Sequence, residues 1–386
     1  MRPTWASVDL AAIEHNVEEV SRAVAPAGVL GVVKADAYGH GAVPVARAMD
    51  RAGIAGFCVS LVEEGIELRQ AGIRKPIVVL GGVYGRLGSS EPSGAHRGVI
   101  EHELSPVVFD LAQVRAFAAA GGSLGRSPVD VHLKVDTGMG RLGVRVSELD
   151  PFLDALDQLG GVRVAGLMTH LASADCEDDR QSAGQLAVFD DVLARVLSRG
   201  HEPDVVHAAN SAAALRYPDA RFDLVRAGLA LYGIAPVGAP RATTAGLRPA
   251  MGLRTEVAAL RTIAEGEPVG YAATFVARRR TRVATIPLGY ADGCSRSLGN
   301  RGVALVAGAL VPFCGNVSMD MAALDVTDVS HVAVGDEVVL LGAQQGPAGS
   351  GRIRAEDVAA RWGTIPYEVL TSVSRRVPRV YLRSET

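Results

Sequence analysis

Lys34 is the residue whose type and position most directly suggest chemistry. It follows the apolar run 29–33 and opens the stretch Ala-Asp-Ala-Tyr-Gly-His-Gly, so one amine stands where a buried strand gives way to a glycine-rich turn. The chain has 39 basic residues, and only Lys34, Lys75 and Lys134 are lysines. Lysine, unlike arginine, can lose its proton and add to a carbonyl as a Schiff-base nucleophile. Lys34 is therefore a candidate nucleophile.

The elements around Lys34 predict an α/β fold. Eight short apolar runs recur in the first two thirds of the chain, at 29–33, 54–59, 76–80, 106–109, 129–135, 162–168, 205–208 and 224–231. Segments with helical periodicity lie between them, including 11–24, 43–52, 61–71 and 185–198. Strand and helix repeated eight times predict a (β/α)8 barrel of the TIM type, with a doubly wound sheet as the alternative architecture.

The candidate residues fall where such a barrel has its active site, at the carboxyl ends of the strands. Lys34 ends the first strand; the others are Lys134 and Arg141 at the fifth, His170 at the sixth, Asn210 and Ser211 at the seventh, and Arg226, Gly228 and Leu229 at the eighth. A hydroxyl and bare backbone amides after strands seven and eight suit a phosphate monoester. A Schiff-base lysine facing a phosphate site indicates pyridoxal phosphate (PLP).

Some of these motifs have simpler interpretations when they are taken singly. His170 could be a buried core histidine, and Arg226 could pair with Asp223. Residues 138–143 match the dinucleotide fingerprint GxGxxG and follow a strand. That fingerprint needs an acidic residue at the end of the next strand to hold the ribose, whereas the next strand here ends in Thr169-His170. We therefore interpret the fingerprint as coincidental.

The pattern changes after Gly233. A stretch rich in Pro, Gly and Thr suits a linker, and short β-rich segments follow at 283–286, 303–306, 310–313 and 332–341, with a hairpin-like sequence at 334–338 and one short helix near 355–362. We predict a PLP-binding barrel domain at 1–238 and a smaller, mainly β domain at 239–386.

Composition limits the classes of partner. The net charge is −3 without a long basic run, which argues against nucleic acid or an anionic membrane and favours a small molecule. No apolar stretch reads as a signal sequence or a membrane span, so a cytoplasmic protein is expected. The four cysteines lack a CxxC spacing, so we expect reduced, mostly buried thiols and no metal site.

Six strings lie in order along nearly the whole chain: Val33-Lys-Ala-Asp-Ala-Tyr-Gly-His-Gly41, His132-Leu-Lys-Val-Asp-Thr-Gly-Met-Gly-Arg141, Val225-Arg-Ala-Gly228 with Tyr232-Gly233, Ile286-Pro-Leu-Gly-Tyr-Ala-Asp-Gly293, Val317-Ser-Met-Asp320 and Thr364-Ile-Pro-Tyr-Glu368. With these strings the chain resembles the bacterial alanine racemases. The departures from the family's usual residues are mild: Leu229 for isoleucine, Ala227 for proline and Ser318 for cysteine.

The resemblance implies a role for each matching residue. Lys34 would hold PLP and act as the base on the face that handles the D-enantiomer, and Tyr271 would be the base on the opposite face. Phosphate contacts are implied for Tyr38, Ser211, Gly228, Leu229 and Tyr367, and further cofactor contacts for Leu80, His170, Asn210 and Arg226. Arg141 and Met319 match contacts to the substrate carboxylate, and Lys134 matches a lysine that is often carbamylated and then orients that arginine.

The chemistry of racemisation accounts for two bases. A proton removed from one face of a planar carbanion must be returned to the other face, which requires an acid/base on each side. Tyrosine is a poor base at neutral pH, so Tyr271 needs nearby cations, and His170 and Arg226 are the candidates. The family's arginine at the position of Arg226 faces the pyridine nitrogen and disfavours its protonation, which limits transamination.

The resemblance also implies a homodimer with shared active sites, because Tyr271 and Met319 lie in the β domain and reach the partner's barrel in the family. The implied role is the supply of D-alanine for peptidoglycan. Alternatives remain: a racemase of serine or of several amino acids, a PLP-binding carrier without turnover, a barrel decarboxylase of basic amino acids, and an NAD enzyme. Arg226 disfavours the decarboxylase, since that family has an acidic residue at the pyridine nitrogen.

Overall fold

The structure is a computed structural model that describes residues 2–83 and 92–383. The chain forms two compact units. The barrel unit comprises Ile13–Ala37 and Ala42–Arg248, and the β unit comprises Met1–Ala12, Tyr38–Gly41 and Pro249–Thr386.

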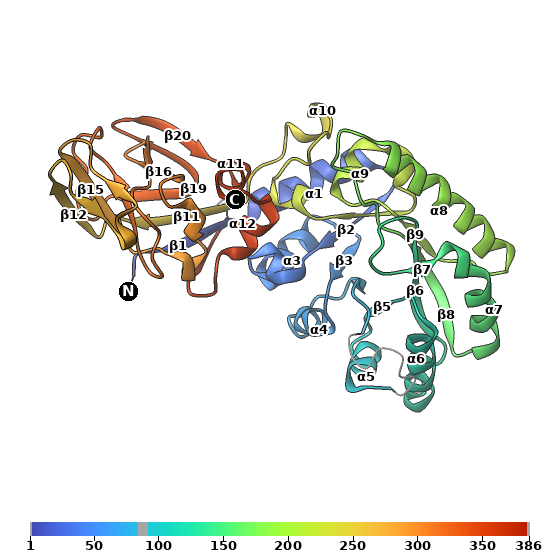
Figure 1. The fold of residues 1–386 in the computed structure, drawn as a ribbon. Helices are drawn as coiled ribbons and strands as arrows, with labels where there is room; N and C mark the ends of the chain where they lie inside the picture. The colour runs from blue at the N-terminus through green and yellow to red at the C-terminus, as the bar shows by residue number, and fades with distance from the viewer. Residues whose placement is uncertain (1, 84–91, 384–386) are drawn as a thin grey trace. The chain divides into compact units, whose positions relative to one another are not determined.

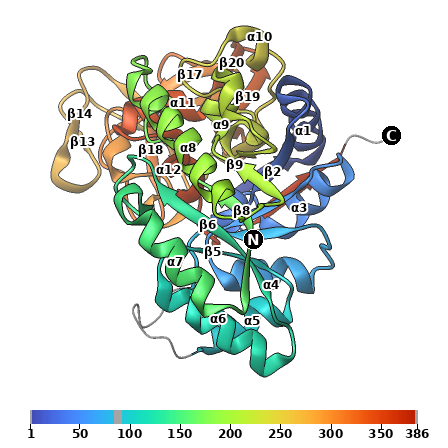
Figure 2. The same cartoon turned by 90° about the vertical axis from the view of Figure 1, so that its right-hand side faces the viewer.

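Eight strands form the predicted barrel, and Figures 1 and 2 show them surrounded by helices. In sheet order they are β10 (Leu224–Ala227), β2 (Gly28–Val32), β3 (Gly56–Val59), β4 (Ile77–Val79), β5 (Ser105–Val108), β6 (Val129–Asp136), β8 (Val162–Met168) and β9 (Val205–His207). Neighbours in this order are parallel. Two backbone hydrogen bonds join β9 to β10, from Asp223 N to Val206 O (3.1 Å) and from Arg226 N to Ala209 O (2.9 Å). The ring is therefore nearly closed, and the (β/α)8 barrel is confirmed.

The longer helices of the barrel unit occur where the sequence has helical periodicity: α1 (Leu10–Val24), α3 (Ala42–Arg51), α4 (Val62–Gln70), α5 (Gly94–Glu101), α6 (Leu111–Leu124), α7 (Leu149–Leu159) and α8 (Arg180–Ser198). Their ends follow from local chemistry. Asp110 caps α6 by accepting a hydrogen bond from Gln113 N at 2.8 Å, and the helix stops at Gly125, whose φ is 65°. The shorter elements are α2 (Lys34–Tyr38), β7 (Val144–Arg145), α9 (Ser211–Arg216), η3 (Leu229–Tyr232) and α10 (Arg241–Thr244).

The β unit is built on a seven-stranded sheet in the order β17 (Ala309–Pro312), β16 (Val303–Val306), β19 (Glu337–Gly346), β11 (Met251–Glu256), β1 (Trp5–Asp9) and β21 (Arg379–Leu382), with β20 (Gly349–Ile353) paired to β19. The strand β1, blue in Figure 1, lies antiparallel to β11 and parallel to β21. Alternate residues of β1, Ala6 and Val8, are fully buried, as expected for a strand with one face on the core.

Smaller elements complete the β unit: β12 (Ala259–Ile263), β15 (Thr281–Ile286) and β18 (Ala322–Asp325) in one sheet, β13 (Pro268–Val269) and β14 (Phe275–Val276) in a ribbon, and the helices α11 (Ala355–Trp362) and α12 (Pro366–Ser372). The predicted short helix coincides with α11. The hairpin-like interpretation of 334–338 was wrong, because Gly335 N donates to Val257 O in a turn that leads into β19. The hairpin of this region joins β19 to β20 at Gly346 and Gly349.

The cysteines behave as expected. Cys58, Cys294 and Cys314 are buried free thiols, and Cys176 is an exposed one. Among the described residues, no helix is both long and apolar enough to cross a membrane.

Candidate active site

The barrel unit brings the predicted rim residues together at the carboxyl ends of its strands. Lys34 is separated from the end of β2 by one residue, Val33, and Leu80, which directly follows β4, donates its N–H to Val59 O at 2.9 Å. The remaining predicted residues of this rim come from β6, β8, β9 and β10 and from the loops that follow them: Lys134, Arg141, His170, Asn210, Ser211, Arg226, Gly228 and Leu229.

The backbone after Lys34 has an unusual conformation. Ala35, Asp36 and Ala37 have φ values of 52°, 54° and 52°, which is the left-handed region that favours glycine. Such a conformation costs roughly 1–2 kcal/mol per residue, so surrounding contacts must hold it. Glu64 Oε1 accepts from Ala35 N, and Asp36 Oδ1 accepts from Ala42 N, both at 2.7 Å. The carboxylates of Glu64 and Asp36 thus hold the backbone that follows Lys34 in this conformation.

The Lys34 amine is biased towards its neutral form. Burial, and next the positive charge of Arg141, lower its pKa, against the opposing effects of Glu64 and Cys58. A neutral amine is the form that adds to a carbonyl or accepts a proton. The environment of Lys34 therefore suits a nucleophile or a general base.

Arg226 forms the centre of a buried polar network. Its side chain donates to the carbonyl oxygens of Thr169 (2.8 Å), His207 (2.9 Å) and Ala208 (2.8 Å). It also donates to two imidazoles, at His207 Nδ1 (2.9 Å) and His170 Nδ1 (3.1 Å). Burial lowers the pKa of Arg226 to about 10, so it stays charged at neutral pH.

The simple alternative for Arg226, a pair with Asp223, does not occur. Asp223 Oδ2 instead accepts from the backbone N–H of Val206 at 2.7 Å. Within the described residues, no carboxylate lies within ion-pair distance of the Arg226 guanidinium. Its positive charge is therefore uncompensated at the rim.

The donors of Arg226 fix the protonation of three histidines. Because guanidinium only donates, Nδ1 of His207 and Nδ1 of His170 must be acceptors, and each ring carries its proton on Nε2. His207 Nε2 then donates to His132 Nδ1, 2.9 Å away. Burial, and next the charge of Arg226, lower the pKa of His132 to about 4 and those of His170 and His207 well below their usual value. All three rings are neutral at physiological pH.

The sequence predicts no function for His132 or His207. Both are buried on strands, β6 and β9, where a histidine is often only a core residue. The signal that could have identified His132 is its place at the start of the string that ends at Arg141. His207 has no comparable signal, because only the fold places it against Arg226.

Lys134 is a second amine with altered protonation. It is 5% exposed, and burial, followed by the charges of Arg226 and Arg141, lowers its pKa to about 8. About a tenth to a quarter of such amines are neutral between pH 7 and 7.5. Lys134 therefore has a larger neutral fraction at neutral pH than an exposed lysine has.

The loop after Lys134 explains the false dinucleotide fingerprint. Although burial acts in the opposite direction, bonds from the N–H groups of Gly138, Gly140 and Met139 lower the pKa of Asp136. These amides therefore hold a carboxylate of their own loop, at 2.8–3.2 Å, rather than a ligand phosphate. No helix begins here, since β7 follows directly. The interpretation of the fingerprint as coincidental is consistent with this geometry.

The loops after β9 and β10 supply donors for an anion. Ser211 Oγ accepts from Gly228 N at 2.7 Å, which leaves the hydroxyl proton available to donate outward. Asn210 caps α9 by accepting from Ala213 N at 3.0 Å. In the described part of the chain, nothing accepts the N–H of Leu229. The Ser211 hydroxyl and the open Leu229 amide after the last two strands fit the phosphate of PLP.

The β unit holds the other predicted residues. Tyr38 and Tyr367 lie edge to face, with ring centroids 5.6 Å apart. Tyr271 stands in the turn between β13 and β14 and is 71% exposed, and Met319 is 52% exposed. Asn316 Nδ2 donates to Tyr271 O at 2.9 Å, which links the segment of Met319 to the turn of Tyr271. Tyr271 and Met319 are thus open to solvent in a single chain.

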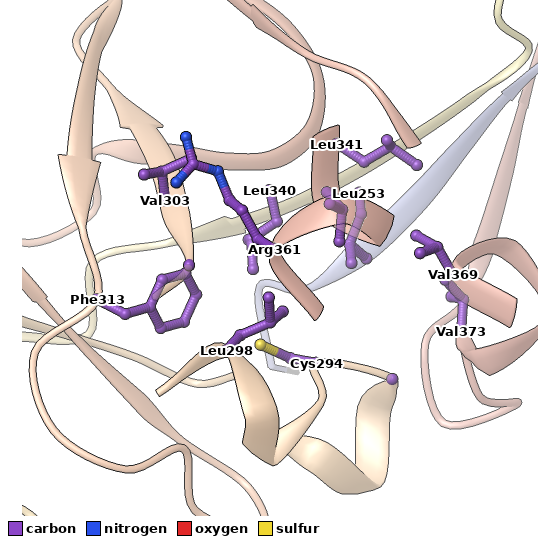
Figure 3. A pocket seen from close by; sticks show the side chains of 13 residues that line it. Leu253, Cys294, Leu298, Val303, Phe313, Leu340, Leu341, Arg361, Val369 and Val373 are labelled. Carbon is purple, nitrogen blue, oxygen red and sulfur yellow. The ribbon is translucent and has the colours of Figure 1, made fainter. Parts of the chain in front are cut away.

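The apolar pocket in Figure 3 is separate from these residues. It lies between strands β11 and β19 and helices α11 and α12, and it is lined by Leu253, Leu340, Leu341, Val369, Val373 and Cys294 among others. Burial raises the pKa of the Cys294 thiol to about 12, so the thiolate is scarce. The predicted site residues do not line this pocket, and it carries no catalytic constellation.

Comparison with family models gives two matches that together span most of the chain. The model "Alanine racemase, N-terminal domain" matches residues 8–236, and "Alanine racemase, C-terminal domain" matches residues 250–381. Among similar proteins, the alanine racemase of Sorangium cellulosum is 51% identical over 386 residues and covers 99% of each chain. That of Geobacter sulfurreducens is 45% identical over 385 residues, 99% of this chain and 97% of the relative.

Solved structures give the same result. The alanine racemase of the D-cycloserine producer Streptomyces lavendulae superposes with a TM-score of 0.90 at 37% identity, covering 99% of this chain and 97% of that one. The Bacillus anthracis alanine racemase with bound L-Ala-P has a TM-score of 0.89 at 35% identity, covering 100% and 96% of the two chains.

Proposed function

Because the chain belongs to the alanine racemase family of isomerases, we propose that it interconverts L-alanine and D-alanine by a two-base mechanism with PLP. The observation that carries this proposal is the barrel rim. There the Lys34 amine with its lowered pKa, the charged Arg226 and the Ser211 hydroxyl lie at the carboxyl ends of strands of one barrel. The family membership supplies the reaction, and this rim supplies the groups that the reaction needs.

The residues that would hold PLP fall into three groups. Lys34 would hold it covalently; Ser211, Gly228, Leu229, Tyr38 and Tyr367 would bind the phosphate; and Leu80, His170, Asn210 and Arg226 would contact the rest of the cofactor. PLP, when bound, supplies an electron sink that makes the Cα proton of an amino acid removable. Arg226 would place an N–H donor and a full positive charge at the pyridine nitrogen, which disfavours a proton there.

The histidines beside Arg226 support this assignment. They are neutral acceptors, so they hold the guanidinium without supplying a negative charge that would offset it. An acidic residue in their place would favour a protonated ring nitrogen, as in the decarboxylase alternative. Arg226 held by imidazoles and carbonyls therefore favours proton return to Cα over other fates.

The two bases come from different units of the fold. Lys34 in the barrel unit would move the proton on the face of the D-enantiomer, and Tyr271 in the β unit would do so on the opposite face. We propose that Tyr271 and Met319 act in the barrel of a partner subunit, within a homodimer. Large apolar side chains near them in the sequence are exposed, including Met321 at 54%. Burial of these side chains against a second copy would favour the dimer.

The remaining predicted residues would bind the substrate carboxylate and orient the group that binds it. Arg141 and Met319 would bind the carboxylate of alanine. Lys134, with a pKa of about 8, offers enough neutral amine to add CO2 and form a carbamate. A carbamate would hold the guanidinium of Arg141 by charge, whereas the free ammonium would repel it. The physiological role proposed is the supply of D-alanine for peptidoglycan in the cytoplasm.

The test combines spectroscopy with isotope exchange. Purified protein should show the absorbance of lysine-bound PLP, should place deuterium at Cα of L-alanine in D2O, and should bring alanine to equal amounts of L and D. L-Serine, incubated in parallel, measures substrate breadth. The absorbance without exchange would favour a PLP carrier, and no absorbance after addition of PLP would mean that Lys34 has been misassigned.

A further inference from the structure

A buried carboxylate of the β unit, Asp292, has no part in the site described so far. It ends η5 (Tyr290–Asp292), and its side chain is 0% exposed. Arg2 donates to its Oδ2 at 2.8 Å, and Arg376 Nε lies 3.4 Å from its Oδ1. Taking such charges out of water is expensive, and apolar packing would stabilise the fold at least as well. A positional role would account for the buried charge.

The charges continue from Asp292 to the loop that carries Met319. Arg376 also pairs with Asp320, with Nη2 2.6 Å from Oδ1. Asp320 directly follows Met319 in the sequence. Positive and negative side chains therefore alternate in one series: Arg2, Asp292, Arg376 and Asp320. This series links the loop of Met319 to the N-terminal and C-terminal segments of the β unit.

The turn of Asp292 also holds the same loop through the backbone. Tyr290 N donates to Ser318 O, and Ala291 N donates to Met319 O, both at 3.0 Å. Asp292 Oδ2 accepts from Gly289 N at 3.0 Å and so closes the turn that presents these amides. A Cβ at Gly289 would lie 2.3 Å from Met319 O, so loop and turn are in direct backbone contact.

These contacts hold the backbone of Met319 through its carbonyl oxygen. In the described part of the chain, Met319 O accepts a hydrogen bond and nothing accepts the Met319 N–H. An open backbone amide is a donor that a carboxylate can bind. A shift of the loop would move this amide, while the barrel rim would be unchanged.

We infer that Asp292 is a positioning residue for the substrate carboxylate: with Arg376 and the 289–292 turn it sets the position of the Met319 amide. The inference rests on the proposed function, because it assumes that Met319 contacts the carboxylate of alanine. Asp292 itself touches neither substrate nor cofactor in this scheme. Its effect is confined to carboxylate binding and leaves the loading of PLP on Lys34 unchanged.

The experiment compares Asp292→Asn with the wild-type holoenzyme. Asparagine keeps the shape of the side chain but removes the charge that faces Arg2 and Arg376. The quantities measured are KM and kcat for L-alanine, the Ki of propionate, the PLP absorbance and the thermal midpoint. Propionate keeps the carboxylate and methyl group of alanine without its amine. KM and Ki should rise together by about five- to fiftyfold, within the roughly hundredfold that a 1 Å misplacement can cost.

Two further variants keep the test decisive. Arg376→Met breaks the same series at a side chain that is 48% exposed, so it should fold even if Asp292→Asn does not, and it should raise KM and Ki in the same direction. Asp328→Asn is the matched control, because it removes the same charge from an exposed pair with Arg279 in the same unit. It should leave both constants within about twofold of the wild type.

The outcomes separate this inference from the proposed function. Unchanged KM and Ki with a lowered thermal midpoint would mean that Asp292 is only structural, and would overturn the inference while the racemase assignment stands. A wild-type protein without PLP absorbance or exchange would instead contradict the proposed function, and the inference with it.

Discussion

The two units carry their candidate residues in opposite environments. In the barrel unit, the side chains of Lys134 and Arg226 are buried, and Arg226 is held by five hydrogen bonds to carbonyls and imidazoles. In the β unit, Tyr271 and Met319 are more than half exposed. A pre-organised rim and an open pair of side chains are consistent with the proposed site, in which the β unit acts against a second subunit. In the proposed function, the barrel supplies the cofactor electrostatics and a partner subunit supplies the second base.

Removal of Lys34 should have the largest effect. Lys34→Ala loses both the covalent hold on PLP and one acid/base group, so kcat/KM should fall by more than about 10⁴-fold. The PLP absorbance of the washed protein should disappear as well. Lys75→Ala is the matched control, since Lys75 only donates to Ile54 O and lies 3.7 Å from Asp50. Retained activity in Lys34→Ala would remove the barrel rim from the mechanism.

Tyr271→Phe tests the exposed base that the β unit would supply. Loss of one acid/base group should lower kcat by about 10²- to 10⁴-fold in both directions, with PLP loading unchanged. Exchange of the Cα proton of D-alanine in D2O should persist, because Lys34 serves that face. Tyr217→Phe is the control. The Tyr217 hydroxyl is buried without a hydrogen-bond partner among the described residues, so its loss should leave kcat unchanged. Equal loss of exchange for both enantiomers would contradict two separate bases.

Removal of one hydrogen-bond partner of Arg226 should have a smaller effect, on the free energy of unfolding and on the absorbance of PLP. His207→Phe leaves a buried guanidinium donor without its acceptor, which should lower the free energy of unfolding by about 1–3 kcal/mol in urea titrations. The absorbance of bound PLP should shift as the position of Arg226 relaxes. His96→Phe is the control in helix α5 of the same unit, where the ring packs on Phe117, and it should cost less. An unchanged spectrum in His207→Phe would mean that Arg226 does not need this support.

Substitution of Lys134 should change stability by a similar amount, but only in a limited range of pH. Its folded pKa of about 8 lies below the usual 10.5, so the buried charged form destabilises the fold below about pH 8, and this cost fades as the pH rises towards 10.5. Lys134→Met in bicarbonate-free buffer should therefore be more stable than the wild type by about 1–3 kcal/mol at pH 7, with the difference shrinking above pH 8. Bicarbonate should stabilise the wild type alone. A pH-independent difference would contradict the lowered pKa.

Much of the barrel could be predicted from sequence because its strands are continuous apolar runs bounded by turns. The strand β1 was missed, since Trp5–Asp9 alternates buried and half-buried residues over only five positions. The position of Lys34 near the end of a strand could also be predicted, and burial lowers the pKa of its amine there. His207 and Asp292 could not be predicted, because their significance comes from partners 19 and 290 residues away, Arg226 and Arg2. Long-range pairing of this kind is set by the fold rather than by local pattern.

Subunit mixing tests the shared site most directly. Lys34→Ala and Tyr271→Phe chains should each lose nearly all racemase activity, but a heterodimer would contain one site with both native bases. Statistical exchange in a two-fold dimer should restore roughly a quarter of the wild-type activity per chain. Absence of recovery, after mass spectrometry has confirmed that heterodimers formed, would contradict a site built from the barrel of one subunit and the β unit of its partner.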